Sequence, residues 1–279
     1  MKEIDVNQII ENVKKLCIEC ATFVSNDALE RIKKAKDNEK GLAKEILSQI
    51  IENDEIAIKE NVPLCQDTGI MVAFVEIGND VHLNGDLYEA INEGVRQGYT
   101  DGYLRKSVCK SPLNRVNTKD NTPAIVHVKY NMGDKLKITL CPKGAGSENM
   151  SKVKMLVPAD GINGIKKFVK DTILEAGGRC CPPIIVGLGI GGDLEKCALL
   201  AKEALTRDLD DTSSDIDAKN LEDELLKEIN ELNVGPMGLG GKTTCLAVKV
   251  NLYACHIASL PVAINIQCHA SRHRSVELW

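Results

Sequence analysis

The stretch 184-IIVGLGI-190, followed closely by 194-LEKCALLAKEAL-205, decides the class of fold. A short apolar run rich in isoleucine and bounded by glycine predicts a buried strand, whereas the second segment repeats its apolar residues at helical spacing. Strand-like and helix-like segments are mixed along the whole chain, without strict alternation and without an internal repeat. The sequence therefore predicts an α/β fold of the mixed α+β kind.

The segments outside this stretch extend the prediction in both directions. Residues 5–61 carry apolar residues at helical spacing until Pro63 ends the pattern. Two alternating segments joined by the turn NMGD, 123–130 and 135–141, predict a β-hairpin. We also expect helices over 87–99, 159–177 and 221–232, a polar surface loop over 207–219, and strands over 70–78, 244–254 and 262–268.

These elements predict one domain over residues 1–279. Its N-terminal helical segment, residues 1–61, should pack on mostly antiparallel sheets. Residues 62–279 would form those sheets and the further helices that flank them.

Composition narrows the class of protein. The chain has 279 residues, of which 43% are hydrophobic and 27% charged, so wholesale disorder is excluded. Its 35 basic and 40 acidic residues give a net charge of −5, which argues against binding nucleic acid. The N-terminus lacks a signal-peptide pattern, and no apolar run reaches the roughly 18 residues of a membrane span. We expect a cytoplasmic protein that does not bind membranes.

Eleven cysteines are the unusual feature of the composition. Thiols stay reduced in the cytosol, so paired cysteines there are more often catalytic or metal-binding than disulfide-bonded. Most of the eleven are expected to be small buried hydrophobic residues. The exceptions should lie in glycine-rich or proline-rich loops, where the backbone can approach a ligand closely.

Two such loops lie in the first half of the chain. In PLCQDTG (63–69), Cys65 could bind a metal while Gln66 and Asp67 reach a polar ligand; the alternative is a turn with a buried cysteine. In KGAGSEN (143–149), successive glycines could form an anion-binding nest of backbone N–H groups. The alternative there is an ordinary hairpin end.

Two further loops follow. GGRCCPPIIVGLGIGG (177–192) puts Cys180 and Cys181 before a rigid Pro-Pro pair, but its glycines lack the G-x-G-x-x-G spacing of a dinucleotide site. HIASLPVAINIQCHASRHR (256–274) places His256 and Cys268 at opposite ends of a predicted strand. Its cysteine and histidines suggest zinc, yet a zinc ribbon needs paired C-x-x-C units, and the chain has one, Cys17-x-x-Cys20.

GPMGLGGKTT (235–244) looks like a phosphate-binding P-loop but fails the motif. The position of its first glycine is Pro236, and a predicted helix precedes the loop where a strand should. We do not expect ATP or GTP binding.

Taken in order, these motifs resemble the α subunit of the two-subunit class I fumarate hydratases, a family that includes the L-tartrate dehydratase α subunit. The resemblance covers about residues 8–278. It implies an oxygen-sensitive [4Fe–4S] cluster held by Cys65, Cys181 and Cys268, with Cys180 as an extra thiol that departs from the usual pattern. Three ligands leave one iron open, and that iron can act as a Lewis acid.

The resemblance implies a hydro-lyase that reversibly hydrates fumarate to L-malate, a reaction of the tricarboxylic acid cycle. It assigns catalysis to Asp67 and His256. It also implies substrate contacts by Gln66, Asp67, Arg105, Gly144, Gly146 and His256. The arginine suits this task because its guanidinium can donate two parallel hydrogen bonds to a carboxylate.

Single-chain relatives carry a second domain, so the resemblance implies a separate β subunit that completes the active site around a small dicarboxylate. An α2β2 assembly or an α–α dimer contact is expected. The close alternative is the L-tartrate dehydratase α subunit. An alternative from another class is a zinc-binding or redox-sensing regulator, which would be colourless where an iron–sulfur protein is brown.

Overall fold

The computed structural model describes residues 2–279 and divides them into two compact units. Unit 1 comprises residues 2–24, 54–145 and 272–279, and unit 2 comprises residues 25–53 and 146–271. Each unit has its own four-stranded sheet and its own apolar core. Among the described residues, no helix is long and apolar enough to cross a membrane.

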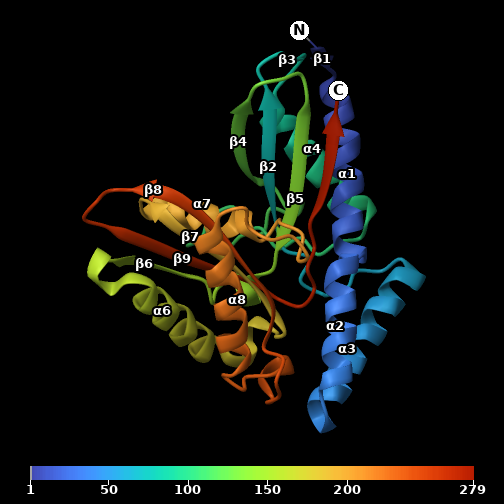
Figure 1. Cartoon of the computed structure of the whole chain (residues 1–279). Coiled ribbons are helices and arrows are strands. Elements are labelled where there is room, and N and C mark those ends of the chain that lie inside the picture. The colour runs from blue at the N-terminus through green and yellow to red at the C-terminus, as the bar shows by residue number, and fades with distance from the viewer. Residues whose placement is uncertain (1) are drawn as a thin grey trace. The chain divides into compact units, whose positions relative to one another are not determined.

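Unit 1 is a mixed sheet covered by helices. The central strand β2 pairs antiparallel with β5 and parallel with β4, and β5 pairs antiparallel with β10. Helices α1 and α4 pack together, and their apolar residues share one core with the sheet (Figure 1). The elements are β1 (Lys2–Ile4), α1 (Val6–Thr22), β2 (Ile70–Gly78), β3 (Val81–Leu83), α4 (Leu87–Asp101), β4 (Ile125–Asn131), β5 (Leu136–Lys143) and β10 (Arg274–Leu278).

Unit 2 has a sheet with helices on both faces. The sheet order is β6-β9-β7-β8, in which β7 and β8 are parallel and the other two pairings are antiparallel. The core of α6 and α8 lies on one face, and α7 packs on the other. The elements are α2 (Asn26–Asn38), β6 (Lys152–Leu156), α6 (Gly161–Ala176), β7 (Ile184–Gly192), α7 (Leu194–Ala204), α8 (Ile216–Asn230), β8 (Cys245–Cys255) and β9 (Leu260–Gln267).

Two helices lie at the divisions between the units. The helix α3 (Gly41–Glu60) begins in unit 2 and ends in unit 1, and the single turn α5 (Ala145–Glu148) follows β5 at the other division. The predicted fold class is confirmed: the N-terminal segment is helical, and both sheets are mostly antiparallel. The 235–244 loop joins helix α8 to strand β8, which is not the strand–loop–helix order of a P-loop.

The predicted hairpin of residues 123–130 and 135–141 is wrong. Both strands form, but β2 lies between them and pairs with each. β2 is largely buried, whereas the edge strand β4 is largely exposed. The more apolar strand therefore occupies the centre of the sheet, and this long-range pairing replaces the local turn.

Strand β7 explains the glycines of 184-IIVGLGI-190. Ile184, Val186 and Leu188 face the core shared with α6 and α8, so the alternate positions face α7. A Cβ at Gly189 would lie 2.0 Å from the carbonyl oxygen of Cys197, and one at Gly187 would lie 2.1 Å from that of Ala201. These glycines let the backbone of α7 lie directly on the sheet.

We expect Gly189→Ala to lower the free energy of unfolding by about 3 kcal/mol, because helix α7 must move to admit the methyl group. Urea unfolding followed by circular dichroism measures this change. Lys154→Ala, on the exposed side of the edge strand β6 in the same sheet, is the control and should change stability by no more than about 0.5 kcal/mol. Equal stability of the two variants would contradict the close approach.

Candidate active site

The turn that carries Cys65, Gln66 and Asp67 lies between α3 and β2 in unit 1. Cys65 and Gln66 are exposed, and the Sγ of Cys65 accepts a hydrogen bond from the backbone N–H of Asp67 at 3.4 Å. The Asp67 carboxylate accepts one hydrogen bond from the N–H of Gly69 at 3.0 Å and another from that of Ala145 at 2.8 Å. Asp67 therefore joins the CQDTG motif to the KGAGSEN motif.

Side-chain hydrogen bonds from other elements of unit 1 also fix the backbone of this turn. The buried Tyr99 hydroxyl donates to the carbonyl oxygens of Thr68 at 2.7 Å and Gly69 at 3.0 Å, and burial raises the pKa of this phenol. The amide of Asn121 donates to the carbonyl of Gly69 at 3.2 Å. The Thr68 hydroxyl donates to the carbonyl of Arg105 at 3.0 Å, so unit 1 brings the backbone of Arg105 to the turn while its side chain is exposed.

Arg272 is a contact that the sequence did not predict. Its Nη1 donates to the carbonyl oxygen of Asp67 at 2.9 Å, and its side chain is buried. A Cβ at Gly144 would lie 3.2 Å from Oδ2 of Asp67 and 3.6 Å from Nη2 of Arg272. The residues Asp67, Gly144 and Arg272 thus form one local group in unit 1.

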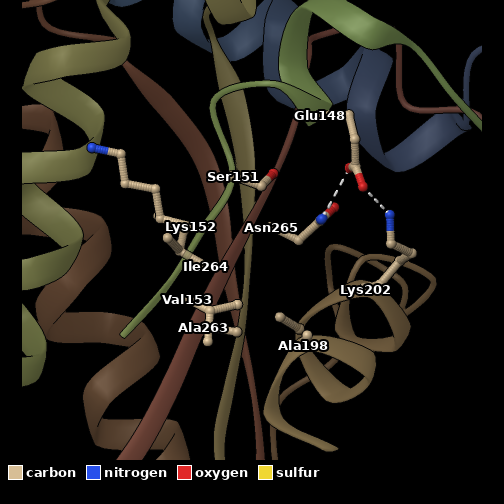
Figure 2. Close-up of a pocket in the computed structure, with 10 residues that line it drawn as sticks. Glu148, Ser151, Lys152, Val153, Ala198, Lys202, Ala263, Ile264 and Asn265 are labelled. Carbon is tan, nitrogen blue, oxygen red and sulfur yellow. Dashed lines mark hydrogen bonds and ion pairs between the residues drawn. The ribbon is translucent and has the colours of Figure 1, made fainter. Parts of the chain in front are cut away.

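The second half of the KGAGSEN motif is braced in unit 2. The Glu148 carboxylate forms an ion pair with Lys202 on α7 and accepts a hydrogen bond from Nδ2 of Asn265 on β9 at 3.0 Å. Figure 2 shows these three side chains converging at one end of a pocket of about 230 Å³ between β6, β9 and α7. Exposed Gly146 begins this braced segment, and a Cβ there would lie 3.3 Å from the carbonyl oxygen of Arg179.

The segments bearing Cys181 and Cys268 meet at one end of the unit 2 sheet. Ile185 near the start of β7 is paired with Gln267 at the end of β9. The backbone N–H of His269 donates to the carbonyl oxygen of Cys181 at 3.4 Å, and Nε2 of Gln267 lies 3.7 Å from the Sγ of Cys268. The topology thus brings together two of the three cysteines predicted as ligands.

Burial distinguishes the adjacent thiols Cys180 and Cys181. Cys180 is 1% exposed, donates its S–H to the carbonyl oxygen of Gly177 at 3.3 Å, and belongs to the core. Burial raises the pKa of this thiol to about 11, which disfavours the thiolate that binds metal. Cys181 is half-buried and adopts the left-handed conformation, with φ of 53°. Of the two adjacent thiols, Cys181 is therefore the more accessible.

His256 lies at the opposite end of the same sheet, in the turn between β8 and β9. It is exposed, and its Nδ1 accepts a hydrogen bond from the N–H of Ala258 at 3.1 Å. β9 runs from Leu260 to Gln267, and an eight-residue strand spans about 26 Å. Unit 2 therefore does not bring His256 near the Cys181 and Cys268 of its own chain.

The donor set fits an iron–sulfur centre. None of the eleven cysteines forms a disulfide in the described part of the chain, and Cys65, Cys181 and Cys268 are each at least partly exposed. Within either unit as described, no three side chains of His, Cys, Asp or Glu are grouped as a metal site, and the three thiols come from both units. Most of the other cysteines have the structural role that the composition predicts; those that are buried are Cys17, Cys20, Cys141, Cys180, Cys197 and Cys245.

Comparison with known proteins gives consistent results. Residues 10–277 match the family model described as fumarate hydratase (fumerase). The chain is 44% identical over 275 residues to a Methanocaldococcus jannaschii protein whose name provisionally gives it as L(+)-tartrate dehydratase subunit alpha, covering 95% of each chain. It is also 30% identical over 276 residues to L(+)-tartrate dehydratase subunit alpha of Escherichia coli K12, covering 97% of this chain and 91% of that protein.

Proposed function

Because the chain belongs to the class I fumarate hydratase family, as an α-subunit-type hydro-lyase, we propose that it dehydrates L(+)-tartrate together with a β subunit. The sequence motifs favour fumarate and L-malate, but the relatives from Methanocaldococcus jannaschii and Escherichia coli both carry the tartrate dehydratase name. Hydration of fumarate is the second candidate, and the description of the matching family model supports it.

The observation that carries the proposal is the arrangement of the cysteines. Cys181 and Cys268 lie on segments that meet at one end of a sheet, both are partly exposed and outside any disulfide, and Cys65 is exposed on a firmly held turn. We propose that these three hold a [4Fe–4S] cluster. Such a cluster, when bound, supplies a Lewis-acidic iron for the hydroxyl group that leaves.

The protein side chains then orient the substrate and stabilise charge. We propose that the exposed Gln66 and Arg105 side chains bind the substrate, with the guanidinium donating two parallel hydrogen bonds to a substrate carboxylate. Asp67 holds the backbone of Gly69 and Ala145 in place, so Gly144 and Gly146 can present main-chain groups to the substrate. Hydrogen bonds of this kind stabilise negative charge that develops as the proton leaves.

The remaining groups are proposed to come from other chains. The names of the relatives specify an alpha subunit, which supports a β subunit that supplies the base for proton removal. Since His256 lies at the far end of β9 from Cys268, it cannot serve the centre built on its own Cys268. We propose that it contacts substrate in a second α chain, in line with the expected α–α contact.

Anaerobic reconstitution of the α and β chains tests this function. We expect about four iron and four sulfide per α chain and a kcat/KM for L(+)-tartrate at least about tenfold above that for L-malate. The α chain alone should give little or no turnover. A preference for L-malate would select the second candidate, whereas a fully loaded complex inactive on both substrates would contradict the proposal.

A further inference from the structure

Arg272 is a buried cation without a carboxylate partner in unit 1. Its side chain is 3% exposed, and its hydrogen bond is to the neutral carbonyl oxygen of Asp67. Its Nε is buried and has no hydrogen-bond partner among the described residues. Burying a guanidinium is costly unless an opposite charge compensates it, so this residue indicates an anion that binds nearby.

The surroundings of Arg272 indicate where that anion binds. A Cβ at the buried Gly144 would lie 3.2 Å from the Oδ2 of Asp67 and 3.6 Å from the Nη2 of Arg272, so both charged groups lie close against the main chain of Gly144. The Asp67 carboxylate accepts its hydrogen bonds from two backbone N–H groups and forms no ion pair with Arg272 among the described residues. The positive charge of Arg272 therefore attracts an anionic group that approaches Gly144 or the turn that carries Cys65, Gln66 and Asp67.

We propose that Arg272 is a positioning residue for the anionic substrate. It fixes the Asp67 carbonyl, and hence the turn that carries Gln66, and it places a permanent positive charge next to the main chain at Gly144. Because its side chain is held in the folded protein, this charge needs no reorganisation when the dicarboxylate binds. This inference rests on the proposed function, which supplies the dicarboxylate, and extends it to a residue outside the predicted set.

Equilibrium binding of succinate to the reconstituted αβ complex tests this role apart from turnover. Succinate is a dicarboxylate without a hydroxyl group to eliminate, so calorimetry measures its affinity even if the complex is inactive. We expect Arg272→Gln to weaken succinate binding by at least about tenfold and Arg272→Lys, which keeps the charge, by less than about threefold. Arg274→Gln removes the same charge two residues away and should change the affinity by less than about twofold.

The catalytic parameters complete the test. In the same variants, the KM for the preferred substrate should rise with the succinate dissociation constant, while the iron content stays that of the unmodified complex. Equal succinate affinity in Arg272→Gln and the unmodified complex would overturn the proposal. Equal losses in Arg272→Lys and Arg272→Gln would do the same, because they would indicate a structural role alone. Loss of tartrate and malate turnover in the unmodified complex would instead contradict the proposed function.

Discussion

Cys181→Ser is expected to abolish the proposed iron–sulfur centre, whereas Cys180→Ser should keep it. The half-buried Cys181 lies beside the segment of Cys268, while the adjacent Cys180 is a core residue with its S–H bonded to Gly177. We expect Cys181→Ser in the αβ complex to lower kcat/KM by more than about 10³-fold, with iron and sulfide near background. Anaerobic iron and sulfide assays, with visible absorption, measure this loss.

Cys180→Ser is the matched control because it makes the same substitution one residue away. It should retain the cluster but lower the free energy of unfolding by about 1–3 kcal/mol, since a more polar hydroxyl replaces the thiol in a buried position. Cys65→Ser and Cys268→Ser should behave like Cys181→Ser. Loss of iron from Cys180→Ser with retention in Cys181→Ser would exchange the two roles and contradict the assignment from burial.

Asp67→Ala should produce the second large effect. The substitution removes the carboxylate that binds the N–H groups of both Gly69 and Ala145, so the Cys65 turn and the Gly144 segment lose their direct connection. Small displacements of positioning groups can cost about 100-fold in rate, and we expect at least that loss in kcat/KM. Hydrogen exchange should show faster exchange at the amides of Gly69 and Ala145.

Two further substitutions serve as an intermediate case and as a control for this prediction. In Asp67→Asn, the side-chain NH2 group faces one of the two backbone N–H donors, so one of the two hydrogen bonds is lost. The kcat/KM of this variant should lie between that of the unmodified complex and that of Asp67→Ala. Asp134→Ala removes an exposed aspartate from another turn of unit 1 and should leave both amides and activity unchanged. Unchanged protection at Gly69 and Ala145 in Asp67→Ala would show that the carboxylate does not connect the two motifs.

Local pattern predicted most elements because their apolar residues repeat over many positions. The strand predicted at 70–78 lies at its predicted bounds, as β2, and the predicted N-terminal helical segment contains α1, α2 and α3. The pairing of β2 between β4 and β5 could not be predicted, because it depends on which strand buries most surface in the finished sheet. The edge strands β6 and β10 were missed because each is only five residues long, too short for its alternation of charged and apolar residues to stand out.

The candidate site likewise contains residues that the sequence predicts and residues that only the tertiary fold brings together. Motif residues such as Cys65 and Asp67 are visible in the sequence because unusual residue types stand together. Tyr99, Asn121 and Arg272 meet the Cys65 turn through the tertiary fold, from positions far away in the chain. The SRHR run at 271–274 was the one available signal for Arg272, and it suggested metal ligands instead. The twelve-residue spacing of His256 and Cys268 is the length of a strand with its turn, which separates them in space.

The firmly held Cys65 turn has a consequence for oxygen damage. Its backbone is fixed by Tyr99, Asn121 and Arg272, contacts that involve neither iron nor sulfide. A segment ordered in advance loses little conformational freedom when it captures a ligand. Rebuilding the proposed cluster after oxidation should therefore need fresh iron, sulfide and electrons but no refolding of this turn, so the visible colour should return at the rate at which these are supplied.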